Sequence, residues 1–344
     1  MKKWAASASA LLFSISFIFS FTCPALERSN HLAQSSPFVL PIVKRDSLLN
    51  GLHLITLEQQ NTGKIAAHLR INSGGLFDLA GKGGLADVTA GMLLKGGGGF
   101  NAKNIAETIE QLGLTVNIRA SWDSTDISIA GPVDSLEATF DLLGRMLISP
   151  SFDQKELDTL KTARIAELNQ EAKDPDVAVW RKAQEAVFGS HPFGRPFFGT
   201  PESVAQIARP DLVYFHNRFY IANNAELVVS GDVTAEQVTR LARSKLGAWK
   251  KGERIPPTFK LPEMPASRRI LILDRADEQT ARSATTQVGV SRRAENYFAA
   301  VIAADVLGAH VSKITALHRE TTVETRLEAR LLAGPLMVRI KAAP

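Results

Sequence analysis

The first hydrophobic pattern in the chain predicts two strands. Apolar and polar residues alternate over Leu52–Leu57 and again over Ile65–Ile71, and the polar segment Glu58–Gly63 between them has the composition of a turn. Alternation with a period of two is typical of strands that bury one face. We therefore expect the two segments to form a hairpin.

A second copy of this pattern occurs much later in the chain. Arg269–Asp274 and Thr286–Val290 repeat the two strands. Each pair of strands is followed by a segment with helical periodicity that ends before a glycine, Leu85–Lys95 in the first copy and Tyr297–Leu307 in the second. Because self-similarity of this kind is typical of duplicated units, the pattern predicts two related α/β domains.

The remaining periodic segments predict long helices packed with strands, which is an α+β fold. Helices are expected over Ala102–Leu112, Val133–Leu147 and Phe152–Glu171, the last preceded by Ser151 and ended by Pro175; strands are expected over Thr115–Ile118, Thr125–Ala130 and Ala225–Ser230, the last followed by a helix that Thr234 opens.

The charged, proline-rich segment 251–268 has the composition of a linker. It divides the chain into a first domain over 49–250 and a second over 269–344. The second domain is the shorter one, so if it mirrors the first it is incomplete, and we expect its sheet to have an unpaired edge.

The N-terminus has the layout of a secretory signal peptide. Lys2 and Lys3 precede an uncharged, apolar and serine-rich run from Trp4 to Thr22, and small residues follow at Cys23 and Ala25. We expect a signal peptide over 1–25, a polar lead-in over 26–48, and export to the periplasm or the outside of a bacterial cell. An uncleaved membrane anchor is the alternative, although the run is barely long enough to span a bilayer.

Composition excludes several classes of function. The chain is 45% hydrophobic and 22% charged, which suits a folded protein, and its net charge of +5 lies partly in Lys2 and Lys3. So small a basic surplus gives no reason to expect a nucleic-acid partner. Cys23 is the only cysteine, so a disulfide within the chain is impossible.

The helix expected at 84–95 carries two different stripes. Leu85, Val88 and Met92 share one face and are expected to be buried. Asp87, together with the residues three and four positions later, Ala90 and Gly91, forms another face. A glycine inside a helix costs about 1 kcal/mol relative to alanine, so position 91 requires a reason such as the close approach of another backbone or a cavity.

The segments Gly84-Leu-Ala and Met92-Leu-Leu-Lys-Gly96 resemble the active-site helix of the pitrilysin and insulinase zinc metallopeptidases, in the branch that includes mitochondrial processing peptidases. The resemblance covers roughly Leu49–Gly252 well and Ile270–Lys341 loosely. It implies two homologous domains of mixed, largely antiparallel sheet with helices on one face, forming half of a clam-shell. Other segments that follow the family pattern in order are Asn101–Gly113, Asn117 with Ser121, Asp123 and Thr125, Pro150–Asp153, Asp174-Pro175, His191–Arg195, Gly199–Glu202, Asn223-Asn224 and Gly231–Val233.

The resemblance also implies where a zinc site would lie. The family helix carries H-x-x-E-H, in which two histidines bind zinc, a distant glutamate is the third ligand, and the middle glutamate deprotonates the zinc-bound water. In this chain Asp87 and Gly91 stand at the histidine positions and Ala90 at the position of the base, and only the third ligand position, Glu167, matches. We therefore expect no metal, no cofactor and no peptidase chemistry by the family mechanism, and an ion pair between Glu167 and a nearby arginine or lysine.

Two further positions are candidates for peptide binding by resemblance. Asn117 matches the edge strand to which the family adds its peptide. Arg319, within His318-Arg319-Glu320, matches an arginine that helps hold the substrate carbonyl, but Thr325 stands at the position of its tyrosine partner. A solvated arginine at a helix end is an equally good interpretation of Arg319.

Three hypotheses follow. The first is a non-catalytic subunit that forms a heterodimer with a homologue carrying an intact H-x-x-E-H motif and that helps bind extended peptides. The second is a divergent metal-dependent endopeptidase that uses Asp87 and Glu167. The same two carboxylates could contact a hard cation such as Ca²⁺, but two protein ligands fall short of a dedicated site. The third is a truncated product without a stable function.

Overall fold

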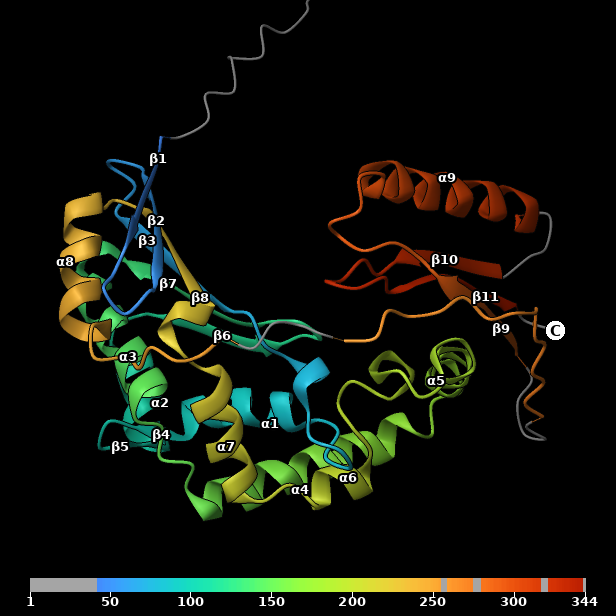
Figure 1. The fold of residues 1–344 in the computed structure, drawn as a ribbon, viewed down its shortest axis with the longest axis horizontal. Coiled ribbons are helices and arrows are strands. Elements are labelled where there is room, and N and C mark those ends of the chain that lie inside the picture. The colour runs from blue at the N-terminus through green and yellow to red at the C-terminus, as the bar shows by residue number, and fades with distance from the viewer. Residues whose placement is uncertain (1–41, 255–258, 275–279, 317–320, 343–344) are drawn as a thin grey trace, which may run out of the picture. The chain divides into compact units, whose positions relative to one another are not determined.

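The computed structural model describes residues 42–254, 259–274, 280–316 and 321–342 (Figure 1). The expected signal peptide and most of the lead-in lie outside these residues. The strands are β1 (Val43–Ser47), β2 (His53–Glu58), β3 (Lys64–Ile71), β4 (Gly96–Gly97), β5 (Phe100–Asn101), β6 (Thr115–Ala120), β7 (Thr125–Pro132), β8 (Ala225–Gly231), β9 (Ala281–Val288), β10 (Thr321–Leu327) and β11 (Pro335–Ala342). The helices are α1 (Leu85–Met92), α2 (Ala102–Gln111), α3 (Leu136–Ile148), α4 (Gln154–Glu171), α5 (Pro175–Phe188), α6 (Pro201–Ala205), α7 (Arg209–Phe219), α8 (Ala235–Leu246) and α9 (Tyr297–Thr315).

The larger sheet has the strand order β1-β2-β8-β3-β7-β6. Both strands of the first expected hairpin form, but the hairpin itself is wrong, because β8 lies between them, parallel to β2 and antiparallel to β3. Alternation reports which face of a strand is buried, and that face is the same whichever strand lies beside it. All other pairings in this sheet are antiparallel.

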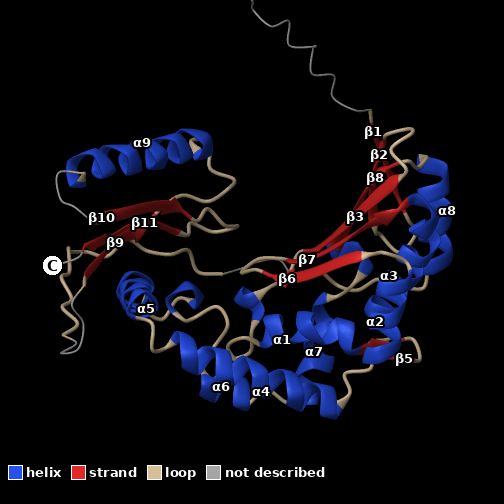
Figure 2. Cartoon of the chain, turned by 180° about the vertical axis from the view of Figure 1, so that it is seen from behind, coloured by secondary structure: helices blue, strands red, loops and turns tan. Residues whose placement is uncertain are grey.

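Helices cover one face of this sheet, as expected (Figure 2). Along β3 the residues Ile65, Ala67, Leu69 and Ile71 are buried, whereas the residues between them are exposed or half-buried. Such alternation requires packed side chains on one side and solvent on the other. The chain therefore has the α+β architecture that its sequence predicts.

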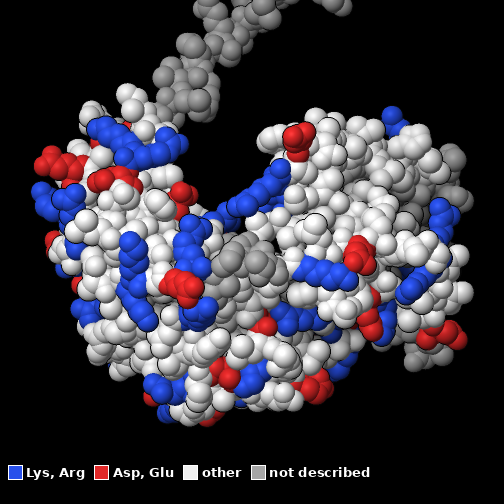
Figure 3. Space-filling view, viewed as in Figure 1, with Lys and Arg blue, Asp and Glu red and all other residues white. Residues whose placement is uncertain are grey.

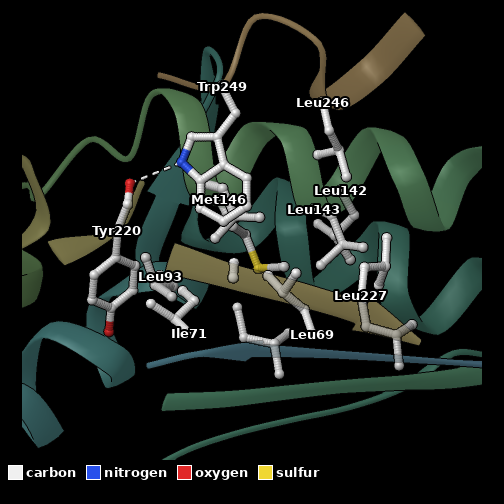
Figure 4. Close-up of a cluster of buried hydrophobic side chains, with 14 of the residues drawn as sticks. Leu69, Ile71, Leu93, Leu142, Leu143, Met146, Tyr220, Leu227, Leu246 and Trp249 are labelled. Carbon is white, nitrogen blue, oxygen red and sulfur yellow. Dashed lines mark hydrogen bonds between the residues drawn. The ribbon is translucent and has the colours of Figure 1, made fainter. Parts of the chain in front are cut away.

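The core between the sheet and the helices is closed by Trp249 (Figure 4). Its side chain is 2% exposed, and the indole N–H donates a hydrogen bond to the carbonyl oxygen of Tyr220 at 2.8 Å. The Tyr220 hydroxyl in turn donates to the Thr125 hydroxyl at 3.2 Å. Met146 on α3 and Leu93 after α1 lie in the same buried cluster. Trp249, near the end of the first domain, thus completes the core formed by α1, α3 and the sheet.

One helix boundary and the role of one proline differ from expectation. The helix α4 begins at Gln154 rather than at Phe152, because Asp153 caps it by accepting hydrogen bonds from two backbone N–H groups of its first turn. It ends at Glu171, as expected, but Pro175 does not end it: this proline is the first residue of α5, where its fixed φ suits a helix start. The start of α8 is confirmed, because Thr234 forms a capping box with Gln237.

The smaller sheet has the order β10-β11-β9, with antiparallel pairings only. The second expected hairpin is wrong: the expected strand Thr286–Val290 overlaps the end of β9, but Arg269–Asp274 forms no strand and is exposed. Gly308 does not end α9, which continues to Thr315. A Cβ at position 308 would lie 3.0 Å from the Cβ of Thr325, so glycine allows the helix to lie close to β10. Within the described residues, β9 and β10 are the two edge strands of this open sheet.

A buried histidine on α7 predicts a loss of stability in acid. His216 is 6% exposed, and burial lowers its pKa from 6.5 to about 4. The unfolded chain therefore binds a proton that the folded chain resists, so stability is lost as the pH falls from 6.5 toward 4, by about 3 kcal/mol from this residue. We expect His216→Gln to remove this dependence in urea unfolding measured between pH 7 and 4.5.

The comparison with the variant is necessary because Asp78 acts in the opposite direction. Burial raises its pKa from 3.8 to about 6, so it favours the folded state as the pH falls through the same range. Equal slopes for the wild type and His216→Gln would show that His216 titrates normally in the folded protein.

Candidate functional site

The start of α1 is fixed by a close backbone contact and by a buried carboxylate. Gly84 has φ +91°, and a Cβ there would lie 2.5 Å from the carbonyl oxygen of Phe198, so only glycine fits. Asp78 accepts hydrogen bonds from the backbone N–H groups of Gly84 at 2.9 Å and Ala86 at 2.8 Å. These contacts set the direction of the helix and hence the position of every side chain on it.

The buried stripe of α1 is confirmed. Leu85, Val88 and Met92 are at most 1% exposed, and the helix packs against α4, α7 and β6. The second stripe therefore faces α4, the helix on which Glu167 lies. The structure thus brings Asp87 and Glu167 to one place, as the resemblance implies.

Arg164 on α4 joins these two carboxylates. Its guanidinium lies 2.7 Å from Asp87 Oδ2 and 2.7 Å from Glu167 Oε2. The same guanidinium lies 5.1 Å from the centre of the Phe198 ring, within the range of a cation–π contact. The expected ion pair of Glu167 is confirmed, and its partner also holds the second carboxylate of the site.

Asp87 is the buried member of this cluster. Its side chain is 15% exposed, against 59% for Glu167. Burial raises the pKa of Asp87 and the charge of Glu167 adds to that shift, while Arg164 opposes it. The guanidinium therefore supplies the positive charge that makes a buried carboxylate tolerable here.

These side chains do not fit a zinc ion. Zinc in peptidases is held by nitrogen donors together with a carboxylate, and the pair here contains no imidazole. A guanidinium, which stays charged at every accessible pH, already binds both carboxylates. Ala90 is buried and has no group that can accept a proton. No step of metal-dependent hydrolysis can be derived from this set of residues.

The glycine at position 91 lies against a side chain, and not against the backbone or the cavity that we expect from the sequence. A Cβ at this position would lie 3.1 Å from Leu160 Cδ2 on α4. The place of the second family histidine is thus taken up by tight packing between two helices. Packing of this kind explains why the helix accepts a glycine in its interior.

The strand β6 is an edge strand, as the resemblance implies for Asn117. Among the residues that the structure describes it pairs with β7 alone, and Asn117 lies on an exposed position opposite Ser128. Because α1 packs against β6, this free edge lies beside the Asp87 cluster. Arg319 lies outside the described residues, and Thr325 lies against Gly308 of α9.

Comparisons with known proteins give the family. Residues 54–201 match the family model described as Insulinase (Peptidase family M16), and residues 206–331 match the one described as Peptidase M16 inactive domain. The chain belongs to the M16 peptidase family. This is the pitrilysin and insulinase family that its helix resembles.

The curated M16 relatives are distant. An uncharacterized zinc protease of Rickettsia bellii is 23% identical over 207 residues, which are 60% of this chain and 50% of that protein. A non-peptidase homolog of Helicobacter pylori is 25% identical over 186 residues, which are 54% of this chain and 43% of that protein. The chain thus spans about half the length of the curated relatives it matches.

A solved M16 structure has the same fold. The crystal structure of a peptidase M16 inactive domain from Pseudomonas fluorescens gives a TM-score of 0.80 at 21% identity, and the match covers 88% of this chain and 74% of that one. At this level of identity the likeness supports the architecture and carries no information about activity.

Proposed function

We propose that this protein is a non-catalytic M16 homologue that helps an active zinc peptidase bind extended peptides. The observation that carries the proposal is the ion-pair cluster of Asp87, Arg164 and Glu167 at the place where catalytic members hold zinc. The guanidinium of Arg164 on α4 supplies the positive charge that the metal would supply between these carboxylates. The fold is therefore kept without a group that hydrolyses peptides.

The free edge of β6 supports a role in peptide binding. An extended peptide can add to such an edge through backbone hydrogen bonds, with side chains on alternate faces. The edge carries the exposed Asn117 and lies next to α1. A subunit of this kind retains the binding surface without the hydrolytic site. The Helicobacter pylori relative is described as a non-peptidase homolog, which agrees with the proposed absence of hydrolysis.

The proposed partner is a homologue with an intact H-x-x-E-H motif, joined with this chain in a heterodimer outside the cytoplasm. Affinity purification from the native host is expected to recover that homologue together with this chain. Repeated recovery of this chain without any M16 partner would count against the heterodimer.

Metal analysis tests the absence of catalysis. The purified chain, incubated with zinc and then desalted, is expected to retain far less than one zinc per molecule and to leave a mixture of extended peptides uncut. Glu167→Ala should change neither result, since its carboxylate is held by Arg164. Stoichiometric zinc together with peptide cleavage that Glu167→Ala abolishes would instead establish the divergent endopeptidase.

A further inference from the structure

The face of the larger sheet opposite the helices carries polar side chains in rows that cross the strands. Residues that pair in register on neighbouring strands project to the same face, so each row can be read from the pairing. One row runs from β2 to the edge strand β6 and consists of His53, Glu226, Arg70, Asp126 and Arg119. From Glu226 onward the charges alternate in sign, and the row ends with the cation of Arg119.

The charges inside this row compensate one another. Asp126 accepts hydrogen bonds from Arg70 Nε at 2.8 Å, from Arg70 Nη2 at 3.3 Å and from the Ser124 hydroxyl at 2.8 Å. Burial raises the pKa of Asp126, but these hydrogen bonds and the charge of Arg70 outweigh burial, so the pKa lies below its ordinary value. The carboxylate therefore stays charged near neutral pH, and Arg70 balances its charge.

Arg119 carries a charge that the row does not balance. It lies directly opposite Asp126 and is exposed, yet it forms no ion pair with any residue that the structure describes, because Arg70 holds the Asp126 carboxylate. Opposite charges on directly paired residues of adjacent strands attract each other, and like charges repel. A strand that adds to the free edge of β6 is therefore most stable when an acidic residue lies opposite Arg119.

The neighbouring row ends in a side chain that can form hydrogen bonds. His68, Ser128 and Asn117 pair in register across β3, β7 and β6, and His68 Nδ1 lies 2.9 Å from Ser128 Oγ. The amide of Asn117 offers both donors and an acceptor. Side chains on one face of a strand are two residues apart, so the ligand residue opposite Asn117 is two positions from the acidic one. A small polar residue suits that position.

The position between these two faces the helices. Ile118 lies between Asn117 and Arg119, is half-buried, and packs against the core of the first domain. The helix α1 packs against the same strand. A ligand side chain on this face lies beside apolar groups, so an apolar residue suits it best.

Selection by charge depends here on single positions rather than on a broad field. On the face drawn in Figure 3, lysine and arginine side chains are interspersed with aspartate and glutamate. Exposed charges that lie farther apart than about 8 Å are largely screened at physiological ionic strength. The residue directly opposite the ligand therefore decides which charge is preferred.

We propose that β6 selects extended peptides in which an acidic, an apolar and a small polar residue follow one another, opposite Arg119, Ile118 and Asn117. Arg119 determines the specificity, because its charge is the one that the ligand must balance. The order of positions is read along β6, so it holds for parallel and for antiparallel addition. This inference rests on the proposed function, since it names the class of peptide that the free edge would bind.

The test uses the full chain and a labelled synthetic peptide in which serine and valine alternate around one central residue. That residue is Asp, Gln or Lys in different versions of the probe. We expect the Asp version to bind at least about five-fold more tightly than the Lys version in fluorescence anisotropy, with slower amide hydrogen exchange in β6. The preference should shrink as salt is added, because the contact is exposed.

Two variants at position 119 test the role of its charge. Arg119→Glu should reverse the order, so that the Lys version binds more tightly than the Asp version. Because that variant also places a carboxylate opposite Asp126, Arg119→Gln is the milder change, and it should bring all versions of the probe within about two-fold of one another. Arg240→Glu is the matched control: Arg240 is an exposed arginine on α8, and its reversal should leave the preference unchanged.

The outcomes separate this inference from the proposed function. If the Gln version binds and slows exchange in β6, but the Asp and Lys versions bind equally well, the specificity is wrong while the proposed function stands. An equal effect of Arg119→Glu and Arg240→Glu would also overturn the inference, because net charge alone would then account for the preference. If no version binds, the peptide-binding role falls together with the inference.

Discussion

Arg164→Ala is expected to lower the free energy of unfolding by about 3 kcal/mol, because it leaves a buried carboxylate without its partner. Asp87 is 15% exposed and its pKa is already raised by burial, so removal of the guanidinium raises that pKa further. The loss should be largest near neutral pH, where the carboxylate must stay charged or take up a proton. Chemical unfolding of the variant and the wild type at pH 7 measures the difference.

Two controls separate this effect from the loss of a surface ion pair. Arg181→Ala removes an ion pair with Glu171 on the neighbouring helix. Its carboxylate is 45% exposed, against 15% for Asp87, so the change should cost less than about 1 kcal/mol. Adding Asp87→Asn to Arg164→Ala removes the buried charge and should recover much of the lost stability. If the double variant is no more stable than Arg164→Ala, the cluster does not act through charge.

Trp249→Ala is expected to have an even larger effect, about 4 kcal/mol. The side chain is 2% exposed, and its indole N–H satisfies the carbonyl oxygen of Tyr220 at 2.8 Å (Figure 4). Truncation opens a cavity beside Met146 and removes that hydrogen bond. Urea unfolding monitored by circular dichroism measures the loss of stability as a lower midpoint.

Trp249→Phe refines this prediction, since phenylalanine fills most of the volume but donates no hydrogen bond. It should be clearly less destabilising than the alanine variant. Tyr214→Ala, at a side chain that is 52% exposed, should change stability by no more than about 0.5 kcal/mol. An equal loss for Trp249→Ala and Tyr214→Ala would mean that the core does not depend on the indole.

The sequence predicts which segments form strands better than it predicts which strands pair with one another. Alternation identifies both β2 and β3, yet it cannot show that β8, which lies far along the chain, inserts between them. The same limit explains Arg269–Asp274, whose apolar residues are strand-like although no described strand lies beside them. Strand formation depends on a partner, and partners are chosen by the tertiary structure.

The sequence likewise predicts only part of the candidate site. Resemblance places Asp87 and Glu167 together, and helical spacing makes Arg164 available to Glu167 from the same helix. The contact between Arg164 and Asp87 joins two helices that are far apart in sequence, so no local sequence pattern predicts it. The glycine at position 91 suggests a nearby backbone or a cavity, and the structure places the side chain of Leu160 there instead.

The position of Arg164 has an evolutionary consequence. Restoring histidines at positions 87 and 91 and glutamate at position 90 would place a metal ion against a permanent cation, which repels it. Removing the arginine first would leave Asp87 unpaired and the fold weakened. Neither order of substitution offers an advantage at its first step, so the Arg164 cluster opposes any stepwise change of this helix toward the H-x-x-E-H pattern.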